Sequence, residues 1–208
     1  NLDAIKLIRQ LDQDGRFPTK EEQDTLARYV GWGGLKSVFD IKKANATDMY
    51  GKAQRELKEL LTPDEYAAAN SSVRNAHYTS EKIVRSMWRM VRHFGFNGGR
   101  VLEPTVGTGN FIGLQPEDLA ASSQWFASEL DDITGKIAAY LYPESTILAG
   151  TGFQNAKFAD GVFDLAIGNP PFGAVTITDK SKQRGHLGGM KIHNYIIAKT
   201  GMHLRPGG

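Results

Sequence analysis

The chain has 208 residues and a formal net charge of +2, from 25 lysines and arginines against 23 aspartates and glutamates. That length is sufficient for one domain of ordinary size with an extension, and the near-neutral charge does not by itself indicate a nucleic-acid binder. Cysteine is absent, which excludes disulfides, zinc–thiolate and iron–sulfur sites, and catalysis by a thiol. No apolar run approaches the roughly 20 residues of a membrane span, and the sequence starts without a signal-peptide pattern, so we expect a cytoplasmic protein with no membrane partner.

The first part of the chain, residues 1–74, is predicted to be a helical extension. Apolar residues recur at helical spacing before Gly15, and helix-start patterns follow at Thr19 and Thr62. Between these two patterns, residues 31–35 (Gly-Trp-Gly-Gly-Leu) predict a tight turn that presents a tryptophan. We interpret this tryptophan as an aromatic residue of the core rather than as a ligand contact.

From about residue 75 onward, a first helix at residues 80–94 is followed by short apolar segments that alternate with helical ones. The basic residues of that helix are interpreted as a solvated face and not as a DNA-binding stripe. The alternation predicts an α/β fold, a Rossmann-like parallel sheet with helices on its faces, which binds ligands at the carboxyl ends of its strands. The predicted strands are 100–103, 124–130, 147–149 and 163–167, and the later helices are 132–141 and 193–203.

A glycine loop follows the first predicted strand, with the sequence Glu-Pro-Thr-Val-Gly-Thr-Gly-Asn-Phe over residues 103–111. Gly107 and Gly109 allow the backbone to approach a ligand closely, and the helix behind them directs its amino terminus toward that ligand. A dinucleotide fingerprint would need a third glycine where Ile112 stands, and Glu103 would repel a pyrophosphate. An acid at the strand end suits a cationic ligand, and S-adenosylmethionine carries both an ammonium and a sulfonium.

A second acid, Glu129, ends the second predicted strand, 22 residues after Gly107. A carboxylate in that position can accept both ribose hydroxyls of a bound nucleoside. An exposed strand-end acid is the alternative, and the register with the glycine loop favours the functional interpretation. Asp131 and Asp132, which follow, are interpreted as surface residues or as a helix cap.

The most specific pattern is Asn169-Pro170-Pro171-Phe172, directly after the fourth predicted strand. Two consecutive prolines end a strand and stiffen the turn, which holds Asn169 at the edge of the sheet. A purely structural turn is the alternative. The aromatic residue placed directly after the prolines favours a site.

This turn suits methylation of a planar amino group, whose nitrogen is a poor nucleophile because its lone pair is delocalised. The side-chain oxygen of Asn169 and the carbonyl of Pro170 can accept the two amine hydrogens, which draws the nitrogen toward tetrahedral geometry and directs its lone pair at a sulfonium methyl. Phe172 can stack on a base that has left its duplex. Methylation of carbon 5 of cytosine is excluded, because that reaction needs a cysteine nucleophile.

Taken together, these residues resemble the N6-adenine DNA methyltransferases with gamma-type motif order. Residues 75–80 (Asn-Ala-His-Tyr-Thr-Ser) are similar to the aromatic-Thr motif that, in that family, precedes the glycine loop and closes over the methionine end of the cofactor. A closer similarity is to the methylase-like region of large methylase–helicase proteins of phages, plasmids and integrative elements. The matching segments are 29–35, 75–79, 103–111, 169–173 and 193–208, so the resemblance extends over nearly the whole chain.

The resemblance implies that residues 75–208 form a class I S-adenosylmethionine-dependent methyltransferase domain. Its target would be adenine in DNA, flipped out of the duplex or single-stranded, with a helicase domain in the same parent chain. The implied cofactor contacts are Tyr78, Thr79, Glu103, Thr105, Gly107, Gly109, Asn110, Phe111 and Glu129, and the implied catalytic residues are Asn169, Pro170, Pro171 and Phe172. The family often has an acid near the cofactor adenine where this chain has Thr-Gly-Phe, so only Phe153 is expected to contact the cofactor there.

The sheet is expected to be incomplete at its carboxyl end, because the chain stops at Gly208, where such folds enter a fifth strand. Strand four or its neighbour would then be an open edge, and we expect a fragment of a longer protein. The histidines lack the spacing of metal ligands, so no metal is expected. The glycine-rich, polar segment 173–191 is either a loop that orders over substrate or a plain surface loop.

Two other functions remain open at this point. The Asn-Pro-Pro-aromatic turn also serves methyltransferases that act on protein glutamine, although the aromatic-Thr motif and the helical leader favour DNA. The non-catalytic alternative is a cofactor-binding or scaffold module in a defence or antirestriction protein, which would act through its partners.

Overall fold

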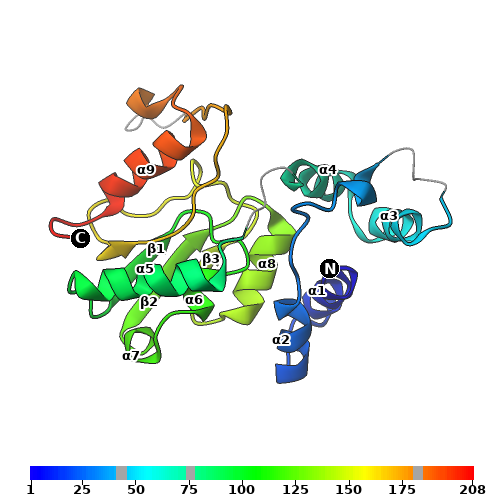
Figure 1. Cartoon of the computed structure of the whole chain (residues 1–208), viewed down its shortest axis with the longest axis horizontal. Coiled ribbons are helices and arrows are strands. Elements are labelled where there is room, and N and C mark those ends of the chain that lie inside the picture. Colours follow the sequence, from blue (N-terminus) through cyan, green and yellow to red (C-terminus); the bar gives the residue numbers. More distant parts are fainter. Residues whose placement is uncertain (41–45, 74–77, 180–184) are drawn as a thin grey trace.

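The computed structural model describes residues 1–40, 46–73, 78–179 and 185–208. These residues form a sheet of four parallel strands, β1 (Gly99–Glu103), β2 (Ser123–Ser128), β3 (Thr146–Leu148) and β4 (Leu165–Ala166). The strand order is β3-β2-β1-β4, which is the beginning of the order found in doubly wound nucleotide-binding folds. The predicted α/β class with a parallel sheet is therefore confirmed (Figure 1).

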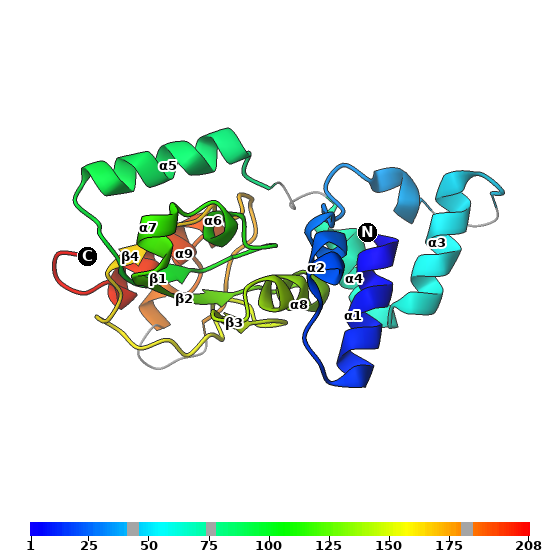
Figure 2. The same ribbon diagram turned by 90° about the horizontal axis from the view of Figure 1, so that it is seen from below.

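Neighbouring residues of a strand point to opposite faces of the sheet, and both faces of β1 are covered. Val101 belongs to a buried cluster with Trp88 of helix α5 (Glu81–His93), which lies along one face (Figure 2). Leu102, the next residue, belongs to a second cluster with Tyr195 of helix α9 (Ile192–His203). The sheet therefore has its own core on each face, as its nearly continuous apolar strands require.

We call residues 1–73 the leader, and its described residues, 1–40 and 46–73, contain four α-helices and a short 3-10 helix. They are α1 (Leu2–Asp14), α2 (Lys20–Ala27), η1 (Lys36–Phe39), α3 (Met49–Leu60) and α4 (Pro63–Ser72). The helix starts predicted at Thr19 and Thr62 are confirmed. Each threonine hydroxyl accepts a hydrogen bond from the backbone amide three residues on, at 3.3 Å, and the carboxylate of the glutamate at that position accepts one from the threonine amide, at 2.7 Å.

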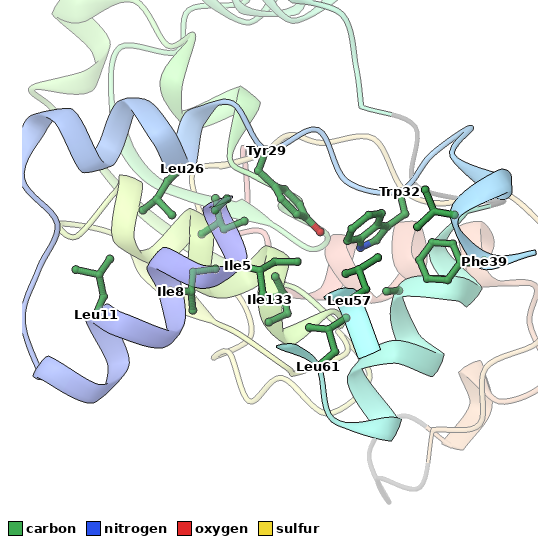
Figure 3. Close-up of a cluster of buried hydrophobic side chains, with 14 residues drawn as sticks. Ile5, Ile8, Leu11, Leu26, Tyr29, Trp32, Phe39, Leu57, Leu61 and Ile133 are labelled. Carbon is green, nitrogen blue, oxygen red and sulfur yellow. The ribbon is translucent and has the colours of Figure 1, made fainter. Parts of the chain in front are cut away.

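The leader packs on helix α8 (Asp132–Leu141), which has the bounds predicted for it. Ile133 and Ile137 of α8 complete a buried cluster whose other members come from the leader (Figure 3). Lys136 adds an ion pair to Asp12 at 2.8 Å, and Tyr140 donates to the same carboxylate at 2.7 Å. Because α8 also packs on the sheet through Ala138, it connects the leader to the strands.

Strand β4 is shorter than the predicted segment 163–167, because only Leu165 and Ala166 join the ladder. Phe163 instead pairs with Leu204 in an isolated parallel bridge, and the Arg205 amide donates to the Phe163 carbonyl at 3.0 Å. The residues after α9 thus lie beside the segment that leads into β4, on the side where the fifth strand was expected. They cover part of the edge that the sequence suggested would be open.

Three short helices complete the described chain. The helix expected behind the glycine loop is interrupted at Pro116 and forms two separate turns, because a proline cannot continue the first one. The short helices are α6 (Asn110–Gly113), α7 (Glu117–Ala120) and η3 (Gly185–Leu187). The turn α6 has only four residues, so the helix dipole expected behind the glycine loop is small.

Candidate functional site

The loops that follow β1, β2 and β4 meet at the carboxyl edge of the sheet. The Ile167 amide donates to the Leu102 carbonyl at 3.1 Å, which continues the β1–β4 pairing to the end of both strands. At the next position, a Cβ atom on Gly168 would lie 3.3 Å from Cγ of Glu103. The turn that begins at Asn169 therefore starts beside Glu103, on the same edge as the glycine loop.

The glycine loop has a backbone that other residues adopt only with strain. Gly107 has a φ of 57° and Gly109 a φ of 86°, both in the left-handed region. The loop is fixed to β2, because the Val106 amide donates to the Ser128 carbonyl at 3.1 Å and the Ser128 hydroxyl donates to the Pro104 carbonyl at 2.7 Å. This second bond is buried, so it holds the start of the loop without competition from water.

Glu129 lies next to the glycine loop, as its register predicted. One carboxylate oxygen accepts the Gly107 amide at 2.9 Å, and the other accepts the Asp131 amide at 2.9 Å. Burial raises the pKa of Glu129, and these two backbone amides oppose the increase because they favour the ionised carboxylate. The backbone amide of Leu130 also favours the ionised carboxylate. Asp131 caps α8 through the Thr134 amide at 2.7 Å, so its interpretation as a cap is confirmed.

Glu103 is a buried acid at the end of β1. Its residue is 2% exposed, and its Oε2 atom is buried without a hydrogen-bond partner among the described residues. Burial raises the pKa of Glu103 well above its usual value, and the negative charge of Glu129 raises it further. A buried acceptor without a partner costs on the order of 1–3 kcal/mol, so this site would be stabilised by a cation or a hydrogen-bond donor.

The aromatic-Thr motif packs on the glycine loop. A Cβ atom on Gly107 would lie 2.9 Å from Cε1 of Tyr78, so the Tyr78 ring rests directly on the loop backbone. The Asn110 side chain donates to the Thr79 carbonyl at 3.2 Å. The structure thus brings two segments together that the resemblance alone had grouped. The remaining residues of the motif, 75–77, lie outside the described residues.

The turn at residues 169–172 presents its aromatic residue to the surface. Asn169 is exposed, the two prolines are half-buried, and the Phe172 side chain is 72% exposed. The Phe172 ring lies 6.0 Å from the ring of His193, at the start of α9, with an interplanar angle of 38°. A planar molecule can therefore reach the free face of Phe172 without any rearrangement of the core.

Two other residues implied by the resemblance are buried, and a third is half-buried with a buried hydroxyl. Phe111 is 2% exposed and belongs to the cluster beneath α5, and its carbonyl accepts the Trp88 indole at 3.0 Å. Phe153 is 4% exposed and packs against His203 at 5.7 Å between ring centroids. The hydroxyl of Thr105 is buried, and none of the described residues accepts or donates a bond to it. Packing accounts for the two phenylalanines, and their cofactor contacts stay predictions.

The sequence did not predict the role of Tyr142 in this site. Its ring fills the space beside two glycines, because a Cβ atom on Gly109 would overlap the ring and a Cβ atom on Gly113 would overlap the hydroxyl. Burial raises the pKa of Tyr142, and the nearby negative charge of Glu103 raises it further. The sequence contained one signal for this contact. Gly109 and Gly113 are four positions apart, so they lie on one side of the turn α6 and leave that side without side chains.

Two kinds of feature were not found in the ranges that the structure describes. No group of three or more histidines, aspartates or glutamates there is arranged to hold a metal ion. No helix in those ranges is both long and apolar enough to cross a bilayer; α1 and α5, of 13 residues each, are the longest of them.

Comparisons with known proteins relate the chain to a phage protein and to solved structures. No protein-family model matches the sequence. The chain is 25% identical over 209 residues to Defense against restriction protein B of Escherichia phage P1, and it spans 8% of that protein's length. Among solved structures, it is similar to a protein of Listeria monocytogenes assigned to the class I S-adenosylmethionine-dependent methyltransferases. The TM-score is 0.43 with 16% identity, over 83% of this chain and 69% of that one.

Proposed function

We propose that this chain binds S-adenosylmethionine and methylates the N6 amino group of adenine in DNA. The observation that carries the proposal is the close contact between Gly168 and the side chain of Glu103. This contact brings the Asn-Pro-Pro-Phe turn beside a buried acid that has one unpaired oxygen, on the edge that also holds the glycine loop. One edge then has a place for a positively charged methyl donor and, next to it, two acceptors for an amine.

The residues of the edge fit this cofactor. The unpaired oxygen of Glu103 would accept a hydrogen bond from the ammonium of the amino-acid portion. The positive charge of this ammonium would compensate the negative charge of the ionised carboxylate. Glu129, which is bonded to the glycine loop through the Gly107 amide, would accept the ribose hydroxyls. When bound, S-adenosylmethionine supplies an electrophilic methyl group on a positively charged sulfur. Tyr78 would cover the glycine loop and exclude water from it.

The turn after β4 would hold the target amine. The Asn169 side-chain oxygen and the Pro170 carbonyl would accept the two amine hydrogens and orient the lone pair, and the adjoining Pro171 keeps the turn stiff. These groups accept hydrogen bonds and do not take up the proton, which leaves to water. Phe172, with its exposed ring, would stack on an adenine that is single-stranded or flipped from the duplex.

Transfer of tritiated methyl groups tests the proposal. The chain, and any longer protein of which it is a part, is incubated with labelled S-adenosylmethionine and either DNA or protein. We expect label in DNA, recovered as N6-methyladenine, and loss of transfer in Asn169→Ala with cofactor binding retained. Label in protein alone would reject the DNA substrate and favour the protein-glutamine alternative.

A second candidate function is supported by the phage relative, whose name describes defence against restriction. In this alternative, the chain is a cofactor-binding or scaffold module that acts through partners, such as a helicase domain in the same parent protein. A parent protein that methylates nothing, and whose antirestriction phenotype is unchanged in Asn169→Ala, would establish this alternative. Loss of that phenotype in Asn169→Ala would support the enzyme.

A further inference from the structure

We propose that Gly31 of the leader is a positioning residue that holds the Tyr78 ring over the glycine loop, so that the leader forms one wall of the cofactor pocket. This inference rests on the proposed function, because it assigns the role of a residue in the same site. It assigns a function to the glycine-tryptophan turn of the leader, residues 31–35, which has no role in the proposed methyl transfer itself.

The Tyr78 ring lies between two glycine backbones. A Cβ atom on Gly31 would lie 2.8 Å from the Tyr78 hydroxyl oxygen and 2.9 Å from Cε2. A Cβ atom on Gly107 would lie 2.9 Å from Cε1, on the opposite edge of the ring. These distances are too short for a Cβ atom at either position, so only glycine at residues 31 and 107 allows the contact with the ring. The ring is thus clamped between the leader and the glycine loop.

The leader side of this clamp is itself held in place. The side chain of Asn1 donates to the Gly31 carbonyl at 2.5 Å and accepts from the Val30 amide at 3.0 Å. Trp32 is 4% exposed and makes edge-to-face contacts with Tyr29 at 6.3 Å and with Phe39 at 5.4 Å between ring centroids (Figure 3). The expectation that Trp32 belongs to the core is therefore confirmed, and the turn that carries Gly31 has little freedom.

A direct contact also connects the leader to the helix that follows Glu129. The Tyr29 hydroxyl lies 3.5 Å from the Thr134 hydroxyl in the first turns of α8. Gly31 lies two residues after Tyr29, so this contact fixes the position of Gly31 relative to α8 as well as to Tyr78. Movement of the Tyr78 ring would uncover Gly107, whose amide donates to Glu129, the predicted ribose acceptor.

Two glycine variants in the same turn separate this role from backbone strain. Gly31 has a φ of 66° and Gly34 a φ of 78°, so alanine is strained at both positions, but a Cβ atom on Gly34 would meet nothing within 4 Å. Calorimetric titration with S-adenosylmethionine measures the dissociation constant of each variant. Because displacement of the ring would remove its contact with the cofactor, and each 1.4 kcal/mol of binding free energy corresponds to about tenfold in affinity, we expect a weakening of at least about tenfold for Gly31→Ala. We expect a change within about twofold for Gly34→Ala.

The double variant Tyr78→Ala/Gly31→Ala tests whether Gly31 acts through the ring. Without the ring, Gly31→Ala should change the affinity no further, so the two effects should not add. Asn1→Ala provides a measurement that does not depend on the folding of Gly31→Ala. It releases the turn without entering the pocket, and we expect affinity to fall several-fold, with a melting temperature that shows a folded protein.

The outcomes distinguish the inference from the proposed function. Equal affinities for Gly31→Ala and Gly34→Ala, or additive effects of Gly31→Ala and Tyr78→Ala, would overturn the positioning role and leave the cofactor site intact. Unchanged affinity in Asn1→Ala would overturn the role as well. A folded wild-type protein that binds no S-adenosylmethionine would overturn the proposed function, and this inference with it.

Discussion

Replacing Glu103 with glutamine tests whether the buried carboxyl group carries an uncompensated charge. Burial raises its pKa well above the usual 4.5, and Glu129 raises it further. Below pH 4.5 the carboxyl is protonated in the folded and the unfolded chain, so it adds no pH dependence. Between 4.5 and the raised folded pKa, the native protein keeps a proton that the unfolded chain has lost. The free energy of unfolding must therefore fall as the pH rises through this window.

The size of the effect follows from one proton. A full proton difference corresponds to about 1.36 kcal/mol per pH unit. For a chain of this length, 1 kcal/mol shifts the melting temperature by about 2–4 °C. The largest slope that Glu103 can contribute is therefore about 3–5 °C per pH unit. Above the folded pKa, the slope returns to zero and the whole cost of the buried charge remains.

Thermal unfolding followed by circular dichroism, at a series of pH values upward from about 4.5, measures this slope. We expect the melting temperature of the wild type to fall more steeply with pH than that of Glu103→Gln. The same substitution at Glu144, whose side chain is exposed, is the control and should follow the wild type. Identical pH profiles for the wild type and Glu103→Gln would refute the account of the buried carboxyl group.

Three further predictions concern the same edge of the sheet. Affinity for S-adenosylmethionine should rise with pH, by up to about tenfold per unit, as Glu103 ionises, and calorimetry that finds a constant affinity would argue against the ammonium contact. Phe172→Ala should change the free energy of unfolding by less than about 0.5 kcal/mol, because the ring is exposed, yet abolish most methyl transfer to DNA; retained transfer would exclude stacking on Phe172. Ser128→Ala should lower the free energy of unfolding by about 1–3 kcal/mol, because it leaves the buried Pro104 carbonyl without its donor, and denaturant titration would show an unchanged midpoint if that bond were unimportant.

Much of the fold was predictable because local rules decide it. The capping threonines fix helix starts through bonds within four residues, and the helix at 132–141 begins where Asp131 can cap it. Strand β4 shows the limit of such rules. The apolar segment 163–167 has the composition of a strand, but its ladder length depends on its partners. Phe163 pairs with Leu204, some 40 residues away, and periodicity contains no information about that contact.

In the site, too, some features follow from general rules and others depend on contacts between distant segments. The positions of Glu103 and Glu129 follow from the general rule that parallel strands end on one edge, so their proximity was predictable. The fit of Tyr78 between Gly31 and Gly107 was not, since it joins segments from two parts of the chain through space that only the folded structure defines. The sequence predicted a tight turn at residues 31–35, and the structure adds the ring that this turn contacts.

Calorimetric titration of the wild-type chain with S-adenosylmethionine, at a pH where Glu103 is ionised and with circular dichroism to establish folding, tests the central claim most directly. We expect heat that saturates at one cofactor per chain and that is lost in Gly107→Leu, whose side chain would enter the space of the Tyr78 ring. A folded wild-type protein that gives no heat would contradict the assignment of this edge as a methyl-donor site.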